Sequence, residues 1–299
     1  MFTLGLDIGA TTIKSAVVNE KGKIKEFKKT KNRFAEGEDF LVCQIASLIN
    51  GYREKFEFDK VGIGFAGYVN QKRGVVISAP NMGSIQNLYI TKTLERKCDV
   101  SIIIDNDAHC LGLAENKFGA GKNYKNIIAI TLGTGIGGAI IIEKKLYRGA
   151  DNSAGEIGHM TIEMSSNKLC GCGGYGHFET FASGAALSNL YEEATGQKVE
   201  NELIAEMASR GEKIAQKCII QVGHYFALGL ANVINIFNPE IIIVGGGFAY
   251  VDLLWQTAMN NIKRYLLHKD LEKTNIVRSN LGEAGGVIGA ALLCEEKNE

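Results

Sequence analysis

The residues best suited to chemistry in this chain are Asp105, Asn106 and Asp107, which directly follow an apolar run at residues 102–104. Three β-branched apolar residues in succession predict a buried strand. Because ligands in open α/β sheets bind beyond the carboxyl ends of the strands, these polar side chains stand where such a fold does chemistry. A carboxylate there can take a proton from a hydroxyl, and a neighbouring amide can hold adjacent hydroxyls. The structural alternative is that Asn106 or Asp107 caps a helix over residues 108–118.

A second candidate is a small-residue turn at residues 9–12, which joins predicted strands at residues 2–8 and 13–18. Small side chains and hydroxyls leave backbone N–H groups accessible, so that the turn can wrap a phosphate. A lysine adds positive charge, and an aspartate there can hold a hydrated Mg²⁺. A plain β-hairpin turn is the alternative. The candidate cofactor residues of this turn are Asp7, Gly9, Ala10, Thr11, Thr12 and Lys14.

The strand–turn–strand pattern recurs about 125 residues later, which indicates an internal duplication. Predicted strands at residues 127–132 and 139–142 flank a turn that contains Gly133, Thr134 and Gly135. Two similar α/β domains, each with a phosphate-wrapping turn, can hold one nucleotide, and this pairing is more specific than a single glycine-rich loop. A flexible glycine-rich stretch at residues 119–123 predicts domains at residues 1–120 and 121–299.

Further elements complete the predicted frame. Gly246 and Gly247 follow a predicted buried strand, and a glycine corner there would let a flat adenine ring lie against the backbone, although a structural tight turn is the alternative. A mostly apolar helix is predicted at about residues 212–236, and a last helix at about residues 285–296, with a small-residue start that allows it to pack back on the first domain. Asn81 lies in a loop and has no obvious structural partner.

Length and composition limit the classes of protein to which this chain can belong. The 299 residues suffice for two domains, and 45% hydrophobic and 22% charged residues are typical of a globular protein. Lys plus Arg equals Asp plus Glu at 33 each, so nothing directs the protein to nucleic acid or to a membrane surface. The start of the chain leads into a strand rather than a signal peptide, so we expect a cytoplasmic protein. Most of the seven cysteines lie singly in apolar segments and are expected to be reduced.

Five segments stand in the order typical of the ROK family, a group of bacterial sugar kinases and transcriptional repressors. They are Asp-Ile-Gly-Ala-Thr-Thr-Ile-Lys at 7–14, Asp-Asn-Asp at 105–107, Leu-Gly-Thr-Gly-Ile-Gly-Gly at 132–138, Ala-Gly-Glu-Ile-Gly-His at 154–159 and Cys-Gly-Cys-Gly-Gly-Tyr-Gly-His-Phe-Glu at 170–179. The chain thus resembles that family over essentially its whole length. The resemblance implies the two-domain α/β fold of actin-like ATPases and hexokinases, which is ribonuclease H-like, with a cleft between the domains.

The resemblance also implies a function. It makes Asp107 the catalytic base of an ATP- and Mg²⁺-dependent hexose kinase that transfers the γ-phosphate to a sugar hydroxyl, with the 6-hydroxyl of glucose or a related hexose as the expected acceptor. It implies a homodimer and five further sugar contacts, Asn81, Asn106, Glu156, His159 and Glu179. Other sugars phosphorylated in the family are N-acetylmannosamine, allose, fructose and β-glucosides, and one sequence does not separate them.

The alternative from another class is a sugar-responsive ROK transcriptional regulator. Family regulators carry a helix-turn-helix domain ahead of the nucleotide motif, whereas six residues precede Asp7 here, and the balanced charge offers no basic patch. Some regulators also lack the catalytic aspartate, which this chain has. An actin- or chaperone-like ATPase without a sugar substrate is disfavoured by the segment at residues 154–159. We therefore expect a kinase.

The last candidate site is a metal site. His159, Cys170, Cys172 and His177 offer two imidazoles and two thiolates, enough for a closed tetrahedral Zn²⁺ site. The family pattern has cysteine where this chain has His177, and an imidazole nitrogen reaches farther from the backbone than a cysteine sulfur, so the loop must shift or the site is lost. Free thiols in a glycine-rich loop are the alternative. If zinc binds, we expect it to fix the loop that carries Glu179 and to orient His159 toward the sugar.

Overall fold

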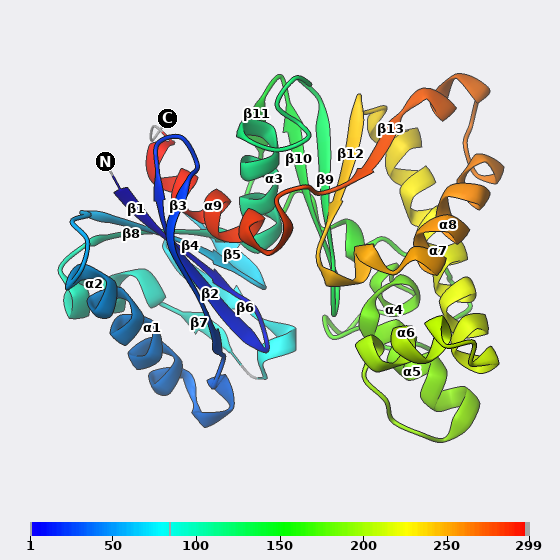
Figure 1. Cartoon of the computed structure of the whole chain (residues 1–299), viewed down its shortest axis with the longest axis horizontal. Helices are drawn as coiled ribbons and strands as arrows, with labels where there is room; N and C mark the ends of the chain where they lie inside the picture. Colours follow the sequence, from blue (N-terminus) through cyan, green and yellow to red (C-terminus); the bar gives the residue numbers. More distant parts are fainter. Residues whose placement is uncertain (1, 84, 297–299) are drawn as a thin grey trace. The chain divides into compact units, whose positions relative to one another are not determined.

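A computed structural model of the chain describes residues 2–83 and 85–296. These residues form two compact units (Figure 1). Unit 1 comprises Met1–Asn123, Ala139–Gly155 and Leu281–Glu299, and unit 2 comprises Tyr124–Gly138 and Glu156–Asn280. The sequence predicts one division after residue 120, whereas in the structure two later segments pack with the first.

The first sheet lies in unit 1 and has the strand order β3-β2-β1-β4-β8. Strands β1, β4 and β8 are parallel, with Leu6 opposite Ile63 and Ile63 opposite Ile104, and β2 and β3 are antiparallel additions at one side. Parallel strands buried on both faces read as continuous apolar runs, which is the pattern that the sequence shows. The bounds are β1 Phe2–Ile8, β2 Thr12–Asn19, β3 Ile24–Lys31, β4 Lys60–Phe65 and β8 Ser101–Asn106.

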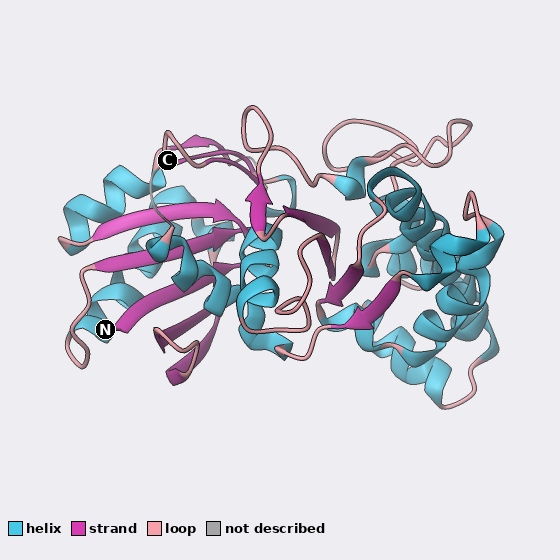
Figure 2. Ribbon diagram, turned by 90° about the horizontal axis from the view of Figure 1, so that it is seen from above, coloured by secondary structure: helices cyan, strands magenta, loops and turns pink. Residues whose placement is uncertain are grey.

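Helices cover both faces of this sheet (Figure 2). Alternate residues of β1 pack with α1 (Glu38–Arg53) and α2 (Ile90–Cys98) in one apolar cluster. α3 (Asp107–Lys117) and α9 (Gly285–Leu292) pack in a second cluster together with residues of β2. A small three-stranded sheet, β5 (Tyr68–Asn70), β6 (Val75–Ser78) and β7 (Gln86–Leu88), completes the unit.

Glycines let α9 approach the sheet backbone to backbone. A Cβ on Gly62 of β4 would lie 1.7 Å from the carbonyl oxygen of Ala290, and a Cβ on Gly289 would lie 1.6 Å from that of Cys110 in α3. Both distances are far below van der Waals contact, so neither position accepts a side chain without movement of the helix. The C-terminal helix therefore packs on the first unit, as its small residues predicted.

The second sheet has the order β11-β10-β9-β12-β13, which repeats the order of the first when the strands of each are numbered in sequence. Its bounds are β9 Ile127–Leu132, β10 Ile136–Ile142, β11 Lys145–Tyr147, β12 Ile241–Gly245 and β13 Asn275–Arg278. This repetition confirms the duplication predicted from the two strand–turn–strand patterns. The second turn is shorter than predicted, because β10 begins at Ile136 rather than at residue 139.

The helices of unit 2 are α4 Glu179–Ala182, α5 Gly184–Thr195, α6 Asn201–Ser209, α7 Lys213–Phe237 and α8 Asp252–Asn261. Among the described residues, α7 is the one helix long and apolar enough to cross a membrane by length and composition, a test that buried core helices also pass. Its most apolar stretch is 56% buried, and α5, α6 and α8 pack against it. We therefore interpret α7 as the core helix of this unit.

Candidate functional site

The edge of the first sheet where β1, β4 and β8 end brings together several predicted residues. Asn106, the last residue of β8, caps α3: its Oδ1 accepts the N–H groups of Ala108 and His109 at 2.8 and 3.3 Å. Its Nδ2 donates to the carbonyl oxygen of Gly67, just beyond β4, at 3.0 Å. The capping alternative is thus confirmed for Asn106, and the cap holds the start of α3 in place.

Asp107 is the first residue of α3 and is partly exposed at this edge. Its Oδ1 accepts the N–H of Ala108 at 2.9 Å. Asp105, by contrast, is fully buried and accepts hydrogen bonds within the protein. The structure therefore separates these two nearby aspartates, because Asp105 is still in strand β8 whereas Asp107 begins α3, where the chain changes direction.

The phosphate-binding candidate at residues 9–12 is held by Asn32, which sequence reasoning missed. The Nδ2 of Asn32 donates to the carbonyl oxygen of Gly9 at 2.7 Å, and its backbone N–H donates to that of Thr11 at 2.9 Å. In a trans peptide the N–H points opposite to the C=O, so the N–H groups of Ala10 and Thr12 point away from Asn32. Backbone donors oriented this way are what a phosphate needs.

Asp7 stands beside this turn, at the end of β1. Its Oδ2 lies 3.4 Å from the Nζ of Lys14, and its side chain is 15% exposed. Burial raises the pKa of the Asp7 carboxyl, and the charge of Lys14 opposes that effect. A Cβ on Gly286 would lie 2.6 Å from the same oxygen, so the start of α9 must be free of side chains here. A partly buried carboxylate at this position offers the hard oxygen ligands that Mg²⁺ prefers.

Asn81 is exposed in a short 3₁₀-helix, Pro80–Met82. The neighbouring Met82 is buried, and its sulfur lies 3.6 Å from the Nδ2 of Asn32. Asn81 therefore directly precedes the residue that contacts Asn32, the support of the turn at residues 9–12.

The second turn, in unit 2, repeats the arrangement with a different support. The carbonyl oxygens of Gly133 and Thr134 accept the N–H groups of Gly184 and Ala185, at the start of α5, at 2.8 and 3.2 Å. By the same peptide geometry, the N–H groups of Thr134 and Gly135 point away from α5. The N–H of Gly133 donates to the carbonyl of Gly135 at 3.1 Å. Gly133 therefore helps to form the turn, and its N–H is not available to a phosphate.

The glycine corner after β12 adjoins this turn. Gly246 has φ +93°, which favours glycine, and a Cβ there would lie 2.3 Å from the carbonyl oxygen of Leu132, the last residue of β9. Gly246 and Gly247 are both exposed. The corner thus presents bare backbone next to the second phosphate turn, where the base of a bound nucleotide would be expected.

Three predicted sugar contacts of unit 2 lie together. His159 has its Nε2 at 3.7 Å from a carboxylate oxygen of Glu156 and its Nδ1 at 3.9 Å from one of Glu179. The other oxygen of Glu179 accepts the N–H of Ile136, at the start of β10, at 3.3 Å. Glu156 and His159 are about one third exposed, at 37% and 31%, and Glu179 is 18% exposed. The group therefore offers several partly solvated acceptors and one imidazole.

The predicted metal ligands are also brought together. The ligand atoms of His159, Cys170, Cys172 and His177 all lie within 4.8 Å of one another. The Nδ1 of His159 is 3.5 Å from the sulfur of Cys170, and the Nδ1 of His177 is 3.3 Å from that of Cys172. Tetrahedral Zn²⁺ with bonds of about 2.0–2.3 Å separates its ligands by about 3.3–3.8 Å. The two histidine–cysteine distances lie in this range, so the arrangement is compatible with Zn²⁺.

Gly174 leaves the space that the imidazole ring of His177 occupies. A Cβ on Gly174 would lie 2.4 Å from the Cε1 of His177, so the imidazole lies directly against the bare backbone of this residue. Burial raises the pKa of the Cys170 thiol to about 12, and the protonated thiol donates to Glu179 at 2.9 Å. A bound cation would replace that proton, as metal binding to thiols requires.

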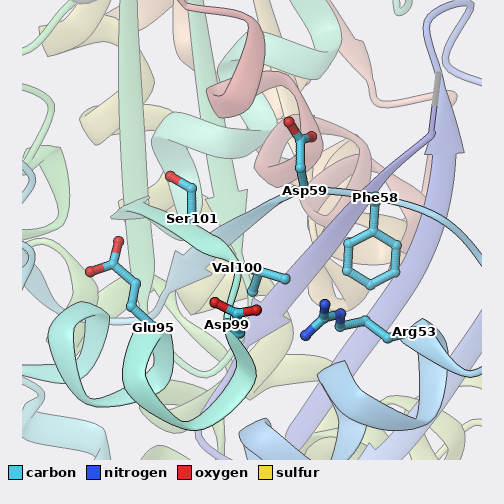
Figure 3. A pocket seen from close by; sticks show the side chains of 7 residues that line it. All are labelled: Arg53, Phe58, Asp59, Glu95, Asp99, Val100 and Ser101. Atoms are coloured by element: carbon cyan, nitrogen blue, oxygen red, sulfur yellow. The ribbon is translucent and has the colours of Figure 1, made fainter.

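A cavity in unit 1 lies away from this edge of the sheet. It has a volume of about 470 Å³ and is lined by residues that include Arg53, Asp59, Glu95 and Asp99 (Figure 3). It opens where β4 and β8 begin, at the edge of the first sheet opposite to Asp107. Because active sites of such sheets lie at the carboxyl ends of the strands, this cavity is not part of the candidate site.

The repeated sheets and the two turns define a two-domain α/β protein of the actin-like ATPase class. A model of the ROK family matches residues 3–297, and the chain belongs to this family. It is 34% identical to a glucokinase of Streptomyces coelicolor, with 98% of each chain covered, and 29% identical to an N-acetyl-D-glucosamine kinase of Haemophilus influenzae, with 97% and 98% covered. Its structure is similar to a ROK family glucokinase from Streptomyces griseus in complex with glucose and AMPPNP (TM-score 0.88, 32% identity, 98% and 99% covered).

Proposed function

We propose that this protein is an ATP-dependent hexose kinase. The observation that carries the proposal is the placement of Asp107 at the first position of α3, on the same sheet edge as the phosphate turn at residues 9–12. A carboxylate next to a phosphate site is what transfer to a hydroxyl requires, because the hydroxyl must lose its proton as the new bond forms. Similarity to glucokinases over nearly the whole chain supports the same reaction.

In this proposal Asp107 is the general base. Its Oδ1 is engaged by the N–H of Ala108, which holds the carboxylate in one orientation and stabilises its charge. The cap formed by Asn106 fixes the same turn. The sugar hydroxyl gives its proton to Asp107 as its oxygen attacks the γ-phosphorus, and the bond from that phosphorus to ADP breaks.

The two turns are proposed to bind ATP. The N–H groups of Ala10 and Thr12 in unit 1, and of Thr134 and Gly135 in unit 2, are the donors that the held carbonyls orient for phosphate oxygens. The exposed corner at Gly246 and Gly247 would receive the adenine. Asp7 would hold a hydrated Mg²⁺, which would neutralise phosphate charge when bound.

The sugar is proposed to contact polar side chains of several types. Carboxylates, amides and an imidazole suit a polyol, because each hydroxyl both donates and accepts. The amide of Asn106 carries two hydrogens, one of which goes to the carbonyl of Gly67. The proposed contacts are Asn81, Asn106, Asp107, Glu156, His159 and Glu179.

Zinc is proposed to bind His159, Cys170, Cys172 and His177. The spacing of their ligand atoms supports this assignment. The metal would supply structure rather than chemistry: it would hold the loop to which Glu179 belongs and fix the ring of His159. Cys170 would then exchange its hydrogen bond to Glu179 for a bond to the metal, which leaves that carboxylate to the sugar.

We propose glucose or a related hexose as the acceptor, with the 6-hydroxyl as the site of transfer. The similarity to an N-acetyl-D-glucosamine kinase supports an N-acetylhexosamine, N-acetylmannosamine among them, as the second candidate. We further propose that the protein is cytoplasmic and homodimeric, and that residues 1–120 supply the base while residues 121–299 supply the zinc loop and adenine corner. Sedimentation of the purified protein tests the dimer.

A panel of hexoses and N-acetylhexosamines, assayed by coupled ADP release, tests the function. The expected result is that one hexose stimulates ADP formation far above the sugar-free rate and that its phosphate ester accumulates in equal amount. If no sugar of the panel raises the rate, the kinase proposal is wrong. If an N-acetylhexosamine alone does so, the second candidate replaces glucose.

A further inference from the structure

A buried network of polar side chains surrounds Asp105, which the proposed reaction does not use. We call it the Asp105 network. The Oδ1 of Asp105 accepts hydrogen bonds from the Nδ1 of His109 at 2.9 Å and the Nδ2 of Asn152 at 3.0 Å. Its Oδ2 accepts the Nε of Arg148 at 2.8 Å. Asp105 is 0% exposed and His109 is 2% exposed.

The geometry defines the protonation state of His109. Its Nδ1 faces the carboxylate of Asp105, and its Nε2 lies 2.9 Å from the carbonyl oxygen of Ala154. A carboxylate and a carbonyl only accept hydrogen bonds, whereas a neutral imidazole has a single N–H. Both contacts are hydrogen bonds only when both ring nitrogens carry a proton. These two contacts therefore favour the imidazolium form of His109.

The charges of the network balance. Arg148 also pairs with Glu296, so the cations His109 and Arg148 meet the anions Asp105 and Glu296. No other ionisable side chain comes from α9, which packs along α3, because its eight residues are all apolar or glycine. Burial opposes the charge of His109, but the hydrogen bond and charge of Asp105 outweigh it, and the pKa of His109 is raised. The same contacts lower the pKa of Asp105 to about 2, although burial alone would raise it.

The network joins two segments that carry proposed site residues. Asp105 and His109 flank Asp107 by two positions on either side, at the end of β8 and the start of α3. Ala154, whose carbonyl His109 holds, is two residues before Glu156. Arg148 and Asn152 come from the same segment as Ala154, and Asn152 also donates to the carbonyl of Val69 at 2.9 Å.

We infer that His109, in its doubly protonated form, is a positioning residue that ties the segment before Glu156 to the turn that carries Asp107. This inference rests on the proposed kinase function for its consequence, and on the hydrogen bonds of His109 for its structure. Loss of one proton removes one of the two bonds of His109, while Arg148 and Asn152 continue to donate to Asp105. The backbone at Ala154 is then held less tightly to the turn that carries Asp107.

The positioning by His109 depends on pH, because it requires the doubly protonated ring. A group whose pKa is raised on folding stabilises the fold below its unfolded pKa, and this stabilisation is lost as the pH rises through the folded value. The positioning by His109 is therefore lost as the pH rises through its raised pKa. Asp105 stays ionised throughout that range, because its lowered pKa affects only strongly acidic solutions.

Long-range ¹H–¹⁵N spectra of the full-length protein test the protonation state directly, and the chain has only five histidines to assign. We expect the pKa of His109 to lie above its ordinary value of 6.5, with both ring nitrogens protonated below that raised pKa, and we expect Asp105→Asn to lower it by at least about one unit. A His109 whose pKa lies at or below its ordinary value would overturn the inference. Because the first measurement uses the unmodified protein, it holds even where a variant fails to fold.

Kinetics and hydrogen exchange of His109→Gln test the positioning. Glutamine has one donor group and carries no charge. We therefore expect kcat for the hexose to fall at least about tenfold, with the KM for ATP within about twofold of the parent value. The decline of kcat at alkaline pH that is expected for the parent should disappear. The amides of residues 154–156 should exchange at least about tenfold faster. His268→Gln, at an exposed histidine of unit 2, is the matched control and should change neither.

The kinase proposal and the positioning role of His109 can be refuted independently of each other. If the parent phosphorylates no sugar, the kinase proposal fails, and the spectra and hydrogen exchange still decide the role of His109. If the parent is a kinase and His109→Gln keeps its kcat, its pH profile and its exchange rates, His109 is not a positioning residue.

Discussion

Replacing Asp107 by asparagine separates the chemical role of this residue from its structural role. Asparagine has almost the same shape, and its Oδ1 can accept the N–H of Ala108 as the carboxylate does at 2.9 Å. The start of α3 is capped by Asn106 rather than by Asp107, so the helix keeps its cap in the variant. The amide cannot take a proton from a hydroxyl. We therefore expect folding and ligand binding to persist while transfer is lost.

The magnitude follows from the single function that is removed. A positioned general base contributes about 10²- to 10⁴-fold in rate, which corresponds to about 2.7–5.4 kcal/mol in activation free energy. The loss of a helix cap, about 1 kcal/mol, does not add to this value, because the cap belongs to Asn106. Turnover of Asp107→Asn should therefore fall by two to four orders of magnitude, with a thermal midpoint close to that of the parent.

Coupled ADP release measures turnover, and calorimetry measures sugar and nucleotide binding. The matched control is Asp59→Asn, an exposed aspartate of the same unit that lines the cavity at the opposite edge of the sheet (Figure 3). It should leave both measurements unchanged. Turnover of Asp107→Asn within tenfold of the parent, with intact binding, would refute the assignment of the base.

Three further outcomes are expected. Gly135→Val should weaken ATP binding by about tenfold or more and leave sugar binding unchanged, because a β-branched side chain blocks the approach of phosphate to the turn; unaltered nucleotide affinity in calorimetry would exclude this turn. Protein purified without chelator should hold about one zinc per chain, and stripping it should raise the sugar KM more than the ATP KM; under about a tenth of an equivalent with full activity would exclude the metal. Gly62→Ala should destabilise the fold by about 1–3 kcal/mol or more, since its Cβ would lie 1.7 Å from the carbonyl oxygen of Ala290. An unchanged thermal midpoint would contradict that packing.

Local patterns predicted much of the fold correctly. The bounds of β1 and β9 agree with the predicted strands at residues 2–8 and 127–132, and the predicted helix at residues 108–118 is α3, shifted by one residue. Apolar runs and caps act within a few residues, so they can be read from the sequence. The start of β10 was misplaced, because the glycines at residues 137 and 138 resemble a turn but pair within the sheet.

Contacts between distant residues could not be predicted in this way. Asn32 supports the phosphate turn from 23 positions away, and Arg148 reaches Asp105 across 43 positions. No local sequence pattern predicts either contact, because the sequence around a polar residue on a strand or loop does not show whether its side chain is solvated or bonds to a buried partner. Gly174 is similar, since its role depends on the ring of His177 that packs against it.

The sequence by itself determined the duplicated α/β frame, the turns in which candidate residues lie and the donor set of the candidate metal site, because these depend on residue type and short-range spacing. Only the tertiary structure decided which groups are oriented for function. It assigned Asn106 to a helix cap, turned Asp105 inward to His109 and Arg148, and aimed the N–H groups of the two turns by holding their carbonyls. The physical reason is that a hydrogen bond depends on the direction of both partners, and direction is a property of the folded chain.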